Sequence, residues 1–496
     1  MEQSNNYKTI MRIVGAVVFV LLFLLVYSKI YNVFRYKDTH GDYLSMPVIL
    51  KDLPKDSLDV AFVGSSHTVC GVLPAVIWEE TGISSMNVGI SGMDKSTCIA
   101  TLNELFKYQS PQVVLVDLYN VTFDEHAVEG NVVRAMFAYE PFESKGLPVI
   151  DQDRKRLIDN EIRINGDSDR YELADANDYY LEWPIVHSRY QELKANDFRE
   201  NPRYEYWLGE EPVMRTSLIS PPELYSIPPE AYILSDENKE YIDEVIRIVE
   251  SNGSQVVFTI IPYPDYSDKD FIQFMSADSY IRGMGYNIIN GLFLQPDIGY
   301  SYDTDFFNGD HLNYWGAKKV SGYLANYLMM FYELEDHRDD PKYMRWEKNW
   351  EYMHQMDQKW DLQNDENGAF GTVIRSSLGS NLCTIIKVTG DLSPEGSSSA
   401  IAYAFGISEA DLAKGGAWII DSGEKVARYL PGNGEEIEYE VNKNLSVKIC
   451  DSKDDKTDIY FNLDRRNMIN SDDESGLEIF VYDEVLDEMI YNGVIK

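Results

Sequence analysis

Two residues of this chain have the side-chain type and the setting that nucleophilic catalysis requires. Ser66 lies in Gly64-Ser65-Ser66-His67, directly after an apolar run that ends at Val63. A strand that ends in a tight Gly-Ser turn places the last hydroxyl at the mouth of a parallel sheet, where a helix start offers N–H groups to a developing oxyanion. A serine hydroxyl also needs a base within hydrogen-bond reach, and histidine has a suitable pKa.

We expect His311 to be that base. It lies in Asp310-His311-Leu312-Asn313, immediately before the last helix of an α/β region. The chain has seven histidines, and those outside the α/β pattern are His40, His337 and His354. Of the others, we interpret His67 as a loop residue, and His126 has no informative context.

Strand-like and helix-like segments alternate on either side of these residues. The expected strands are 58–63, 86–90, 112–118, 255–261 and 286–289, and the expected helices are 72–80, 95–108, 237–250, 269–282 and 313–331. Alternation of this kind predicts a mainly parallel sheet with helices on both faces. The active site then lies at the carboxyl ends of the strands.

Four segments, taken in order, resemble the sequence blocks of SGNH (GDSL-like) hydrolases. Gly64-Ser65-Ser66 is similar to the first block, normally Gly-Asp-Ser. The others are Asn87-Val88-Gly89-Ile90-Ser91-Gly92, Leu118-Tyr119-Asn120 and Asn308-Gly309-Asp310-His311. The resemblance covers roughly 58–332, apart from much of an insertion at about 121–232, and implies an SGNH or flavodoxin-like three-layer fold. It also implies that Ser66 and Gly89 donate backbone N–H groups, and Asn120 its side chain, to the oxyanion.

The Gly-Ser-Ser variant is similar to the teichoic acid D-alanyl transfer protein and to cell-envelope acetylation proteins of Firmicutes. Those proteins are membrane-anchored and work with membrane-bound O-acyltransferases. The resemblance implies a serine esterase or acyltransferase acting on acetyl or D-alanyl groups of an envelope polysaccharide or teichoic acid. Water as acceptor would make it an esterase, and a sugar or polyol hydroxyl a transferase. We expect no cofactor and no metal ion.

Two residues, His187 and Arg189, lie in a segment (184–193) that resembles one shared by such envelope proteins. They either bind substrate or pair with local carboxylates. The side chain of Asn120 also has a second interpretation, since asparagine often caps the turn after a strand.

The chain departs from the SGNH pattern at two positions. Leu118 replaces the usual glycine of the third block, and Asn308 stands where an aspartate would orient the histidine. An asparagine can hold an imidazole but cannot stabilise imidazolium by charge. Asp310 or Asp305 could take that role, or the site could be a dyad. A catalytically inactive SGNH-fold scaffold subunit of an O-acylation complex is therefore the alternative hypothesis.

The N-terminus contains an apolar run, Ile13 to Tyr27, flanked by Lys8, Arg12 and Lys29. Its length suits one membrane crossing, and no small-residue cleavage site follows it. We predict that residues 1–40 form a cytoplasmic tail and a signal-anchor helix, with the large domain extracytoplasmic.

The rest of the chain divides by composition into a catalytic domain at 41–335, a linker helix at 336–368 and a β-rich domain at 369–496. The catalytic domain carries an insertion, about 121–232, that either binds substrate or decorates the fold. The linker helix has an aromatic stripe that we expect to dock one domain on the other, with a sugar-binding platform as the alternative. Short alternating strands in the last domain predict a β-sandwich, for carbohydrate binding or for a structural or docking role.

Composition limits the partners. The formal charge of −38 argues against nucleic acid, because phosphate binding needs clustered basic residues. The four cysteines show no CxxC pair, and the spacing in 303–310 is wrong for a calcium loop.

Overall fold

The computed structural model divides the chain into two compact units, Met1–Trp350 and Glu351–Lys496. It describes residues 2–34, 46–122, 207–222, 233–363, 379–389, 415–432, 434–451, 457–462, 464–465 and 476–495, with a few positions between 155 and 193 and between 371 and 410. Most of the expected insertion lies outside the described residues.

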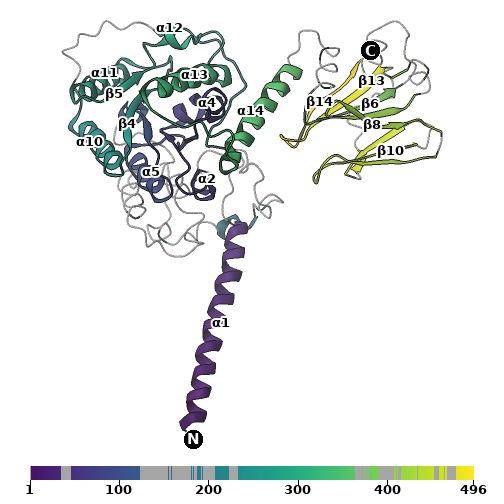
Figure 1. Cartoon of the computed structure of the whole chain (residues 1–496), viewed down its shortest axis with the longest axis horizontal. Helices are drawn as coiled ribbons and strands as arrows, with labels where there is room; N and C mark the ends of the chain where they lie inside the picture. The colour runs from purple at the N-terminus through teal and green to yellow at the C-terminus, as the bar shows by residue number, and fades with distance from the viewer. Residues whose placement is uncertain are drawn as a thin grey trace. The chain divides into compact units, whose positions relative to one another are not determined.

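A five-stranded parallel sheet forms the centre of the first unit (Figure 1). Its strand order is β2-β1-β3-β4-β5. The strands are β1 (Val60–Val63), β2 (Ser85–Asn87), β3 (Val113–Asp117), β4 (Gln255–Ile260) and β5 (Asn287–Asn290). This order brings the ends of β1, β2 and β3 side by side at the carboxyl edge.

Helices cover both faces of this sheet because successive strand residues point into two separate cores. Val63 and Val116 lie in one core, and Phe62 and Leu115 lie in the other. The first core is closed by α2 (Met46–Asp52), α5 (Lys95–Tyr108), α10 (Asp236–Ser251) and α11 (Asp268–Gly283). The second is closed by α4 (Pro74–Thr81), α12 (Gln295–Ile298) and α13 (Tyr314–Phe331). The predicted parallel α/β architecture is confirmed.

A short helix that the sequence did not predict follows β1. α3 (Ser66–Gly71) begins directly after the turn that follows β1. Its N-cap is Ser65, whose side chain accepts a hydrogen bond from the backbone N–H of His67. His67 is therefore a buried helical residue and not the expected loop residue.

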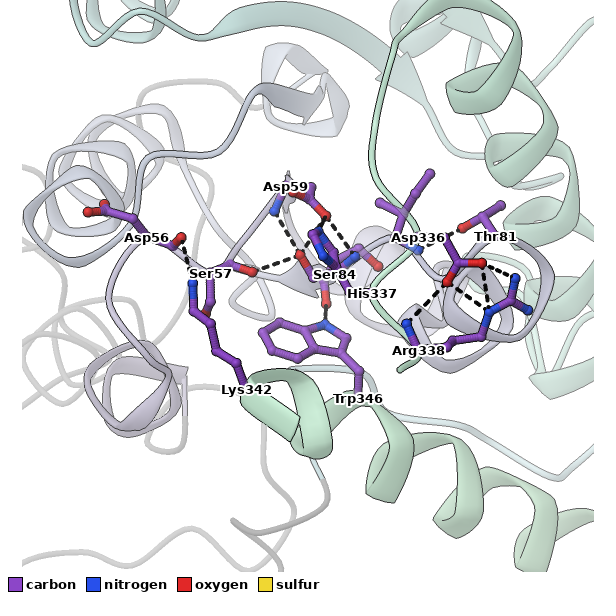
Figure 2. Close-up of polar contacts among 12 residues, drawn as sticks. Asp56, Ser57, Asp59, Thr81, Ser84, Asp336, His337, Arg338, Lys342 and Trp346 are labelled. Carbon is purple, nitrogen blue, oxygen red and sulfur yellow. Dashed lines mark hydrogen bonds and ion pairs between the residues drawn. The ribbon is translucent and has the colours of Figure 1, made fainter. Parts of the chain in front are cut away.

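The chain after α13 crosses the amino ends of β1 and β2, as Figure 2 shows. His337 Nε2 lies 3.0 Å from Asp59 Oδ2, and Ser84 Oγ donates to the same carboxylate oxygen at 2.7 Å. Nearby, Trp346 Nε1 donates to the carbonyl of Ser85 at 2.8 Å. This part of the expected linker thus packs on the first unit itself.

The second unit begins inside α14 (Met344–Gln363) and contains two antiparallel sheets. One has the order β14-β13-β6-β7-β8 and the other β12-β11-β10-β9. The strands are β6 (Leu382–Thr389), β7 (Ala417–Asp421), β8 (Glu424–Tyr429), β9 (Ile437–Glu440), β10 (Ser446–Asp451), β11 (Thr457–Phe461), β12 (Asp464–Arg465), β13 (Gly476–Asp483) and β14 (Glu488–Ile495). Side chains from both sheets, such as Ile419 and Ile449, share one core.

The N-terminal helix α1 (Glu2–Phe34) is long and apolar enough to cross a membrane over Ile10–Phe34. The apolar window within it is 0% buried. A helix that is apolar on all sides and uncovered by protein suits a lipid environment.

Trp346→Ala tests the packing at the amino ends of the strands. Trp346 is fully buried, stacks with Trp78 and donates a hydrogen bond, so its loss should destabilise the first unit by about 3–5 kcal/mol. Unfolding of the full chain in detergent measures this. Met344→Ala, at an exposed position of the same helix, should have little effect on stability. Equal losses of stability in the two variants would show that the packing of Trp346 does not stabilise the first unit.

Candidate functional site

The structure brings Ser66, His311 and Asn308 into one hydrogen-bonded row. Ser66 Oγ lies 2.7 Å from His311 Nε2. On the other side of the ring, His311 Nδ1 lies 3.1 Å from Asn308 Oδ1. A hydroxyl, an imidazole and an orienting acceptor in this order form the arrangement that activates a serine nucleophile.

The contacts of Asn308 determine which imidazole nitrogen carries the proton. Its Oδ1 accepts hydrogen bonds from the backbone N–H groups of Asp310, at 2.9 Å, and His311, at 2.8 Å. Because these groups can only donate, the asparagine atom facing the ring is the oxygen, and Nδ1 of the neutral ring must donate to it. Nε2 is then left to accept the hydroxyl proton of Ser66.

Burial keeps the imidazole of His311 neutral. Desolvation lowers its pKa to about 4, since charge is costly away from water. The ring of Phe307 stacks on it at 5.3 Å between centroids, and His67 lies edge-on at 5.1 Å. At neutral pH the ring is therefore a free base.

The carboxyl end of β1 places Ser66. Gly64 follows β1, and a Cβ there would lie 2.7 Å from Asp117 Cβ and 2.1 Å from Thr68 Oγ1. Only glycine lets the chain pass so close to β3 and to α3. The turn then enters α3, whose N–H groups of Thr68 and Val69 donate to the carbonyl of Ser65.

Gly89 lies against this same turn. The N–H of Ile90 donates to the carbonyl of Gly64 at 3.0 Å, and a Cβ on Gly89 would meet Val69 Cγ2 at 2.8 Å and that carbonyl at 3.0 Å. The loop after β2 is therefore pressed onto the start of α3. Within the described part of the chain, neither the backbone N–H of Ser66 nor that of Gly89 donates to a backbone carbonyl.

Asn120 is buried in the 3₁₀ turn after β3, and its amide is half satisfied. Nδ2 donates to the hydroxyl of Tyr241 at 2.8 Å, while Oδ1 has no partner among the described residues. Tyr241 in turn donates to Cys98 Sγ at 3.2 Å. These contacts anchor Asn120 to α5 and α10, and none of them joins it to Ser66.

The two aspartates considered as partners of His311 have other contacts. Asp305 is buried, forms an ion pair with Lys319 at 2.6 Å and accepts a hydrogen bond from the N–H of Ser301. Asp310 contributes its backbone N–H to Asn308. Burial, then the carboxylates of Asp265 and Asp270, raise the pKa of Asp310. The partner of Nδ1 is thus Asn308.

His187 and Arg189 are placed beside the N-terminal helix. The ring of His187 stacks on Phe34 at 6.0 Å, and Arg189 Nη1 donates to the carbonyl of Phe34 at 2.7 Å. Their described contacts thus join them to α1 and not to Ser66 or His311.

Two residues near Ser66 were not identified from the sequence as parts of the site. Asp117 ends β3 and accepts from the N–H groups of Ile261 and Tyr119, and burial raises its pKa to about 7. His67 stacks on Tyr119 at 3.8 Å, and burial, followed by His311, lowers its pKa. A carboxylate at the end of a predicted strand was the available signal for Asp117.

The returning limb of the insertion, residues 207–222, supports the loop that carries His311. The N–H of Glu211 donates to the carbonyl of Val69 in α3, at 2.9 Å. Further along, Ser217 Oγ donates to the carbonyl of Phe307 at 2.7 Å, and the guanidinium of Arg215 lies over the Phe307 ring at 5.7 Å. This limb therefore contacts both α3 and the His311 loop.

No family model matches this chain, and no curated protein matches it either.

A titration of the imidazoles tests the electrostatics of the site. His311 should stay neutral, with its proton on Nδ1, until the pH falls to about 4, because desolvation lowers its pKa. Imidazole ¹⁵N chemical shifts measure both properties, and a His311→Ala spectrum assigns the signal. An ordinary pKa near 6.5, or a proton on Nε2 at neutral pH, would contradict this description.

Proposed function

We propose that the chain is a membrane-anchored serine esterase or acyltransferase that acts on O-acyl groups, acetyl or D-alanyl, of a cell-envelope polysaccharide or teichoic acid. The observation that carries the proposal is the 2.7 Å contact between Ser66 Oγ and His311 Nε2, with the ring held at Nδ1 by Asn308. The envelope substrate rests on the resemblance to SGNH proteins, and the anchor rests on α1.

In the proposed reaction, His311 takes the hydroxyl proton of Ser66 as Oγ attacks the ester carbonyl. The carbonyl π electrons move to oxygen, and a tetrahedral intermediate forms. Its collapse breaks the bond to the leaving alcohol, which takes the proton from His311 and leaves an acyl-serine. Water or an acceptor hydroxyl, deprotonated by His311, then attacks the acyl-serine. Collapse of this second tetrahedral intermediate breaks the bond between the acyl carbon and Ser66 Oγ, which takes the proton back from His311.

Backbone donors near Ser66 are available for the oxyanion. The N–H groups of Ser66 and Gly89 lie in two loops held together by the bond from Ile90 to Gly64. Preorganised donors of this kind contribute about 3–4 kcal/mol each to transition-state stabilisation. Asn120 would add a third donor if its amide turns toward the substrate.

We expect Asn308, in place of an aspartate, to slow this reaction less than the same replacement slows a serine protease. In serine protease triads an Asp→Asn change costs about 10⁴ in turnover because the ring is held in the wrong tautomer. Here the backbone N–H groups of Asp310 and His311 keep the oxygen of Asn308 toward the ring, so the tautomer is correct. Only the charge that would stabilise imidazolium is missing.

That missing charge also supports a second candidate function. A chain with an SGNH fold and a weak base would act as a scaffold for a membrane-bound O-acyltransferase. The two functions differ in whether Ser66 reacts.

Labelling by a fluorophosphonate probe separates the two functions. The full-length protein in detergent should label at Ser66, and labelling should disappear in Ser66→Ala and in His311→Ala. Ser251→Ala and His354→Ala change exposed residues of α10 and α14 and should label like the parent protein. A folded protein that never labels would favour the scaffold function.

Substitutions of Asn308 test the role of the missing charge. Asn308→Asp keeps an acceptor for all three donors and adds a negative charge, so hydrolysis of a small acetyl ester should rise by about tenfold or more. Asn308→Ala frees the ring to adopt either tautomer and should lower the rate by about 100-fold. Unchanged rates in both variants would show that His311 works without an orienting partner.

A further inference from the structure

The surface of α1 changes character close to Tyr27. Side chains from Ile10 to Val26 are exposed, for example Phe19 at 69% and Leu25 at 60%. Beyond that point Tyr31 is 1% exposed. One side of the last two turns is therefore covered by protein, although Ile30 is still 44% exposed, whereas the earlier turns need another apolar environment.

Part of that cover comes from two rings of the insertion, and a third ring packs on one of them. Trp183 lies 5.4 Å from the ring of Tyr27 and 5.7 Å from that of Phe34. His187 stacks on Phe34, and Tyr190 lies 5.9 Å from His187. We call Trp183, His187 and Tyr190 the aromatic collar. The short blue-green segment beside the C-terminal end of α1 in Figure 1 belongs to this stretch.

Arg189 attaches the collar to the helix. Its Nη1 donates at 2.7 Å to the carbonyl of Phe34, the last residue of α1. The final carbonyls of a helix lack partners within the helix and carry partial negative charge, so a guanidinium there is stabilising. Arg189 is itself 9% exposed, whereas Tyr190 beside it is 56% exposed. The attachment is thus buried and one aromatic ring is left facing outward.

The length of α1 places the collar at the edge of a bilayer. A hydrocarbon core of about 30 Å needs about 20 helical residues. Counted from Ile10, where the apolar segment begins, that length ends close to Lys29. Trp183 of the collar contacts Tyr27 and Phe34, which lie on either side of this boundary. Tyrosine and tryptophan favour such a boundary because their rings are apolar and their tips polar.

We propose that the aromatic collar binds the interfacial region of the bilayer that α1 crosses, with the Tyr190 ring among the lipid headgroups. This inference rests on the proposed membrane anchor and is independent of the chemistry at Ser66. The rings of Trp183 and His187 extend the apolar surface of α1 sideways, near the C-terminal end of the helix. The contact holds the insertion against the membrane surface.

Depth measurement with spin labels tests the proposal on the full chain in phospholipid nanodiscs. Nitroxides are attached at Leu22→Cys in α1, Tyr190→Cys in the collar and Asp297→Cys at an exposed position of α12. All three variants also carry Cys450→Ser, because Cys450 is partly exposed and would react with the label, whereas the other three cysteines are buried. Collisions with oxygen, which enters the bilayer, are compared with collisions with a water-soluble nickel chelate.

The label at residue 190 should give an oxygen-to-nickel ratio between those at residues 22 and 297. A ratio equal to that at residue 297 would overturn the collar while leaving the anchor intact. A water-like ratio at residue 22 would overturn the anchor and the collar together. Ester hydrolysis by the same samples reports separately on Ser66.

Loss of the attachment gives a second measurement. Arg189→Met, added to the Tyr190→Cys chain, removes the donor to Phe34, so nickel accessibility of the label at residue 190 should rise by about twofold as the label leaves the interface. An unchanged ratio at residue 190 in this variant would show that Arg189 does not hold the collar.

Discussion

Asn308 Oδ1 accepts three hydrogen bonds, and the geometry of the site depends on this convergence. Two come from backbone N–H groups and one from the imidazole of His311. The backbone bonds fix the identity of the acceptor atom, which fixes the tautomer of the ring and leaves Nε2 facing Ser66. Desolvation lowers the pKa of His311, so the ring is unprotonated and able to accept.

The fold supplies the other half of this arrangement. Ser66 is held at the end of β1 by a turn that only glycine permits at residue 64. The loop that carries His311 follows β5, an edge strand of the sheet. Ser217, in residues 207–222 of the insertion, stabilises this loop by donating a hydrogen bond to the carbonyl of Phe307. The serine and the histidine are thus carried by separate segments that meet at the carboxyl edge of the sheet.

The sequence was sufficient for the elements whose ends carry strong local signals. The helix expected at 95–108 is observed as Lys95–Tyr108, because Asp94 caps its first turn and its apolar residues recur at helical spacing. The helix α3 was not predicted, because its six residues are too few to show the helical spacing of apolar residues. The parallel sheet followed from the alternation of elements, whereas its order required pairings between distant segments.

The site could be predicted only in part from the sequence, because it too depends on contacts between distant segments. Ser66 and His311 were recognisable as types in suitable places, and the structure brings them within 2.7 Å. The choice among Asn308, Asp310 and Asp305 depended on the path of a tight loop, in which backbone donors select the nearest acceptor. The contacts of His187 and Arg189 with α1 depended on tertiary packing between distant segments.

The most direct test of the central claim is detection of an acyl-enzyme. The full-length protein is mixed with a chromogenic acetyl ester, quenched in acid within the first turnover, digested and analysed by mass spectrometry. The account predicts one added acetyl group on the peptide that contains Ser66, absent from the Ser66→Ala protein. Turnover of the ester with no acetyl group on that peptide, or with the group on another residue, would contradict it.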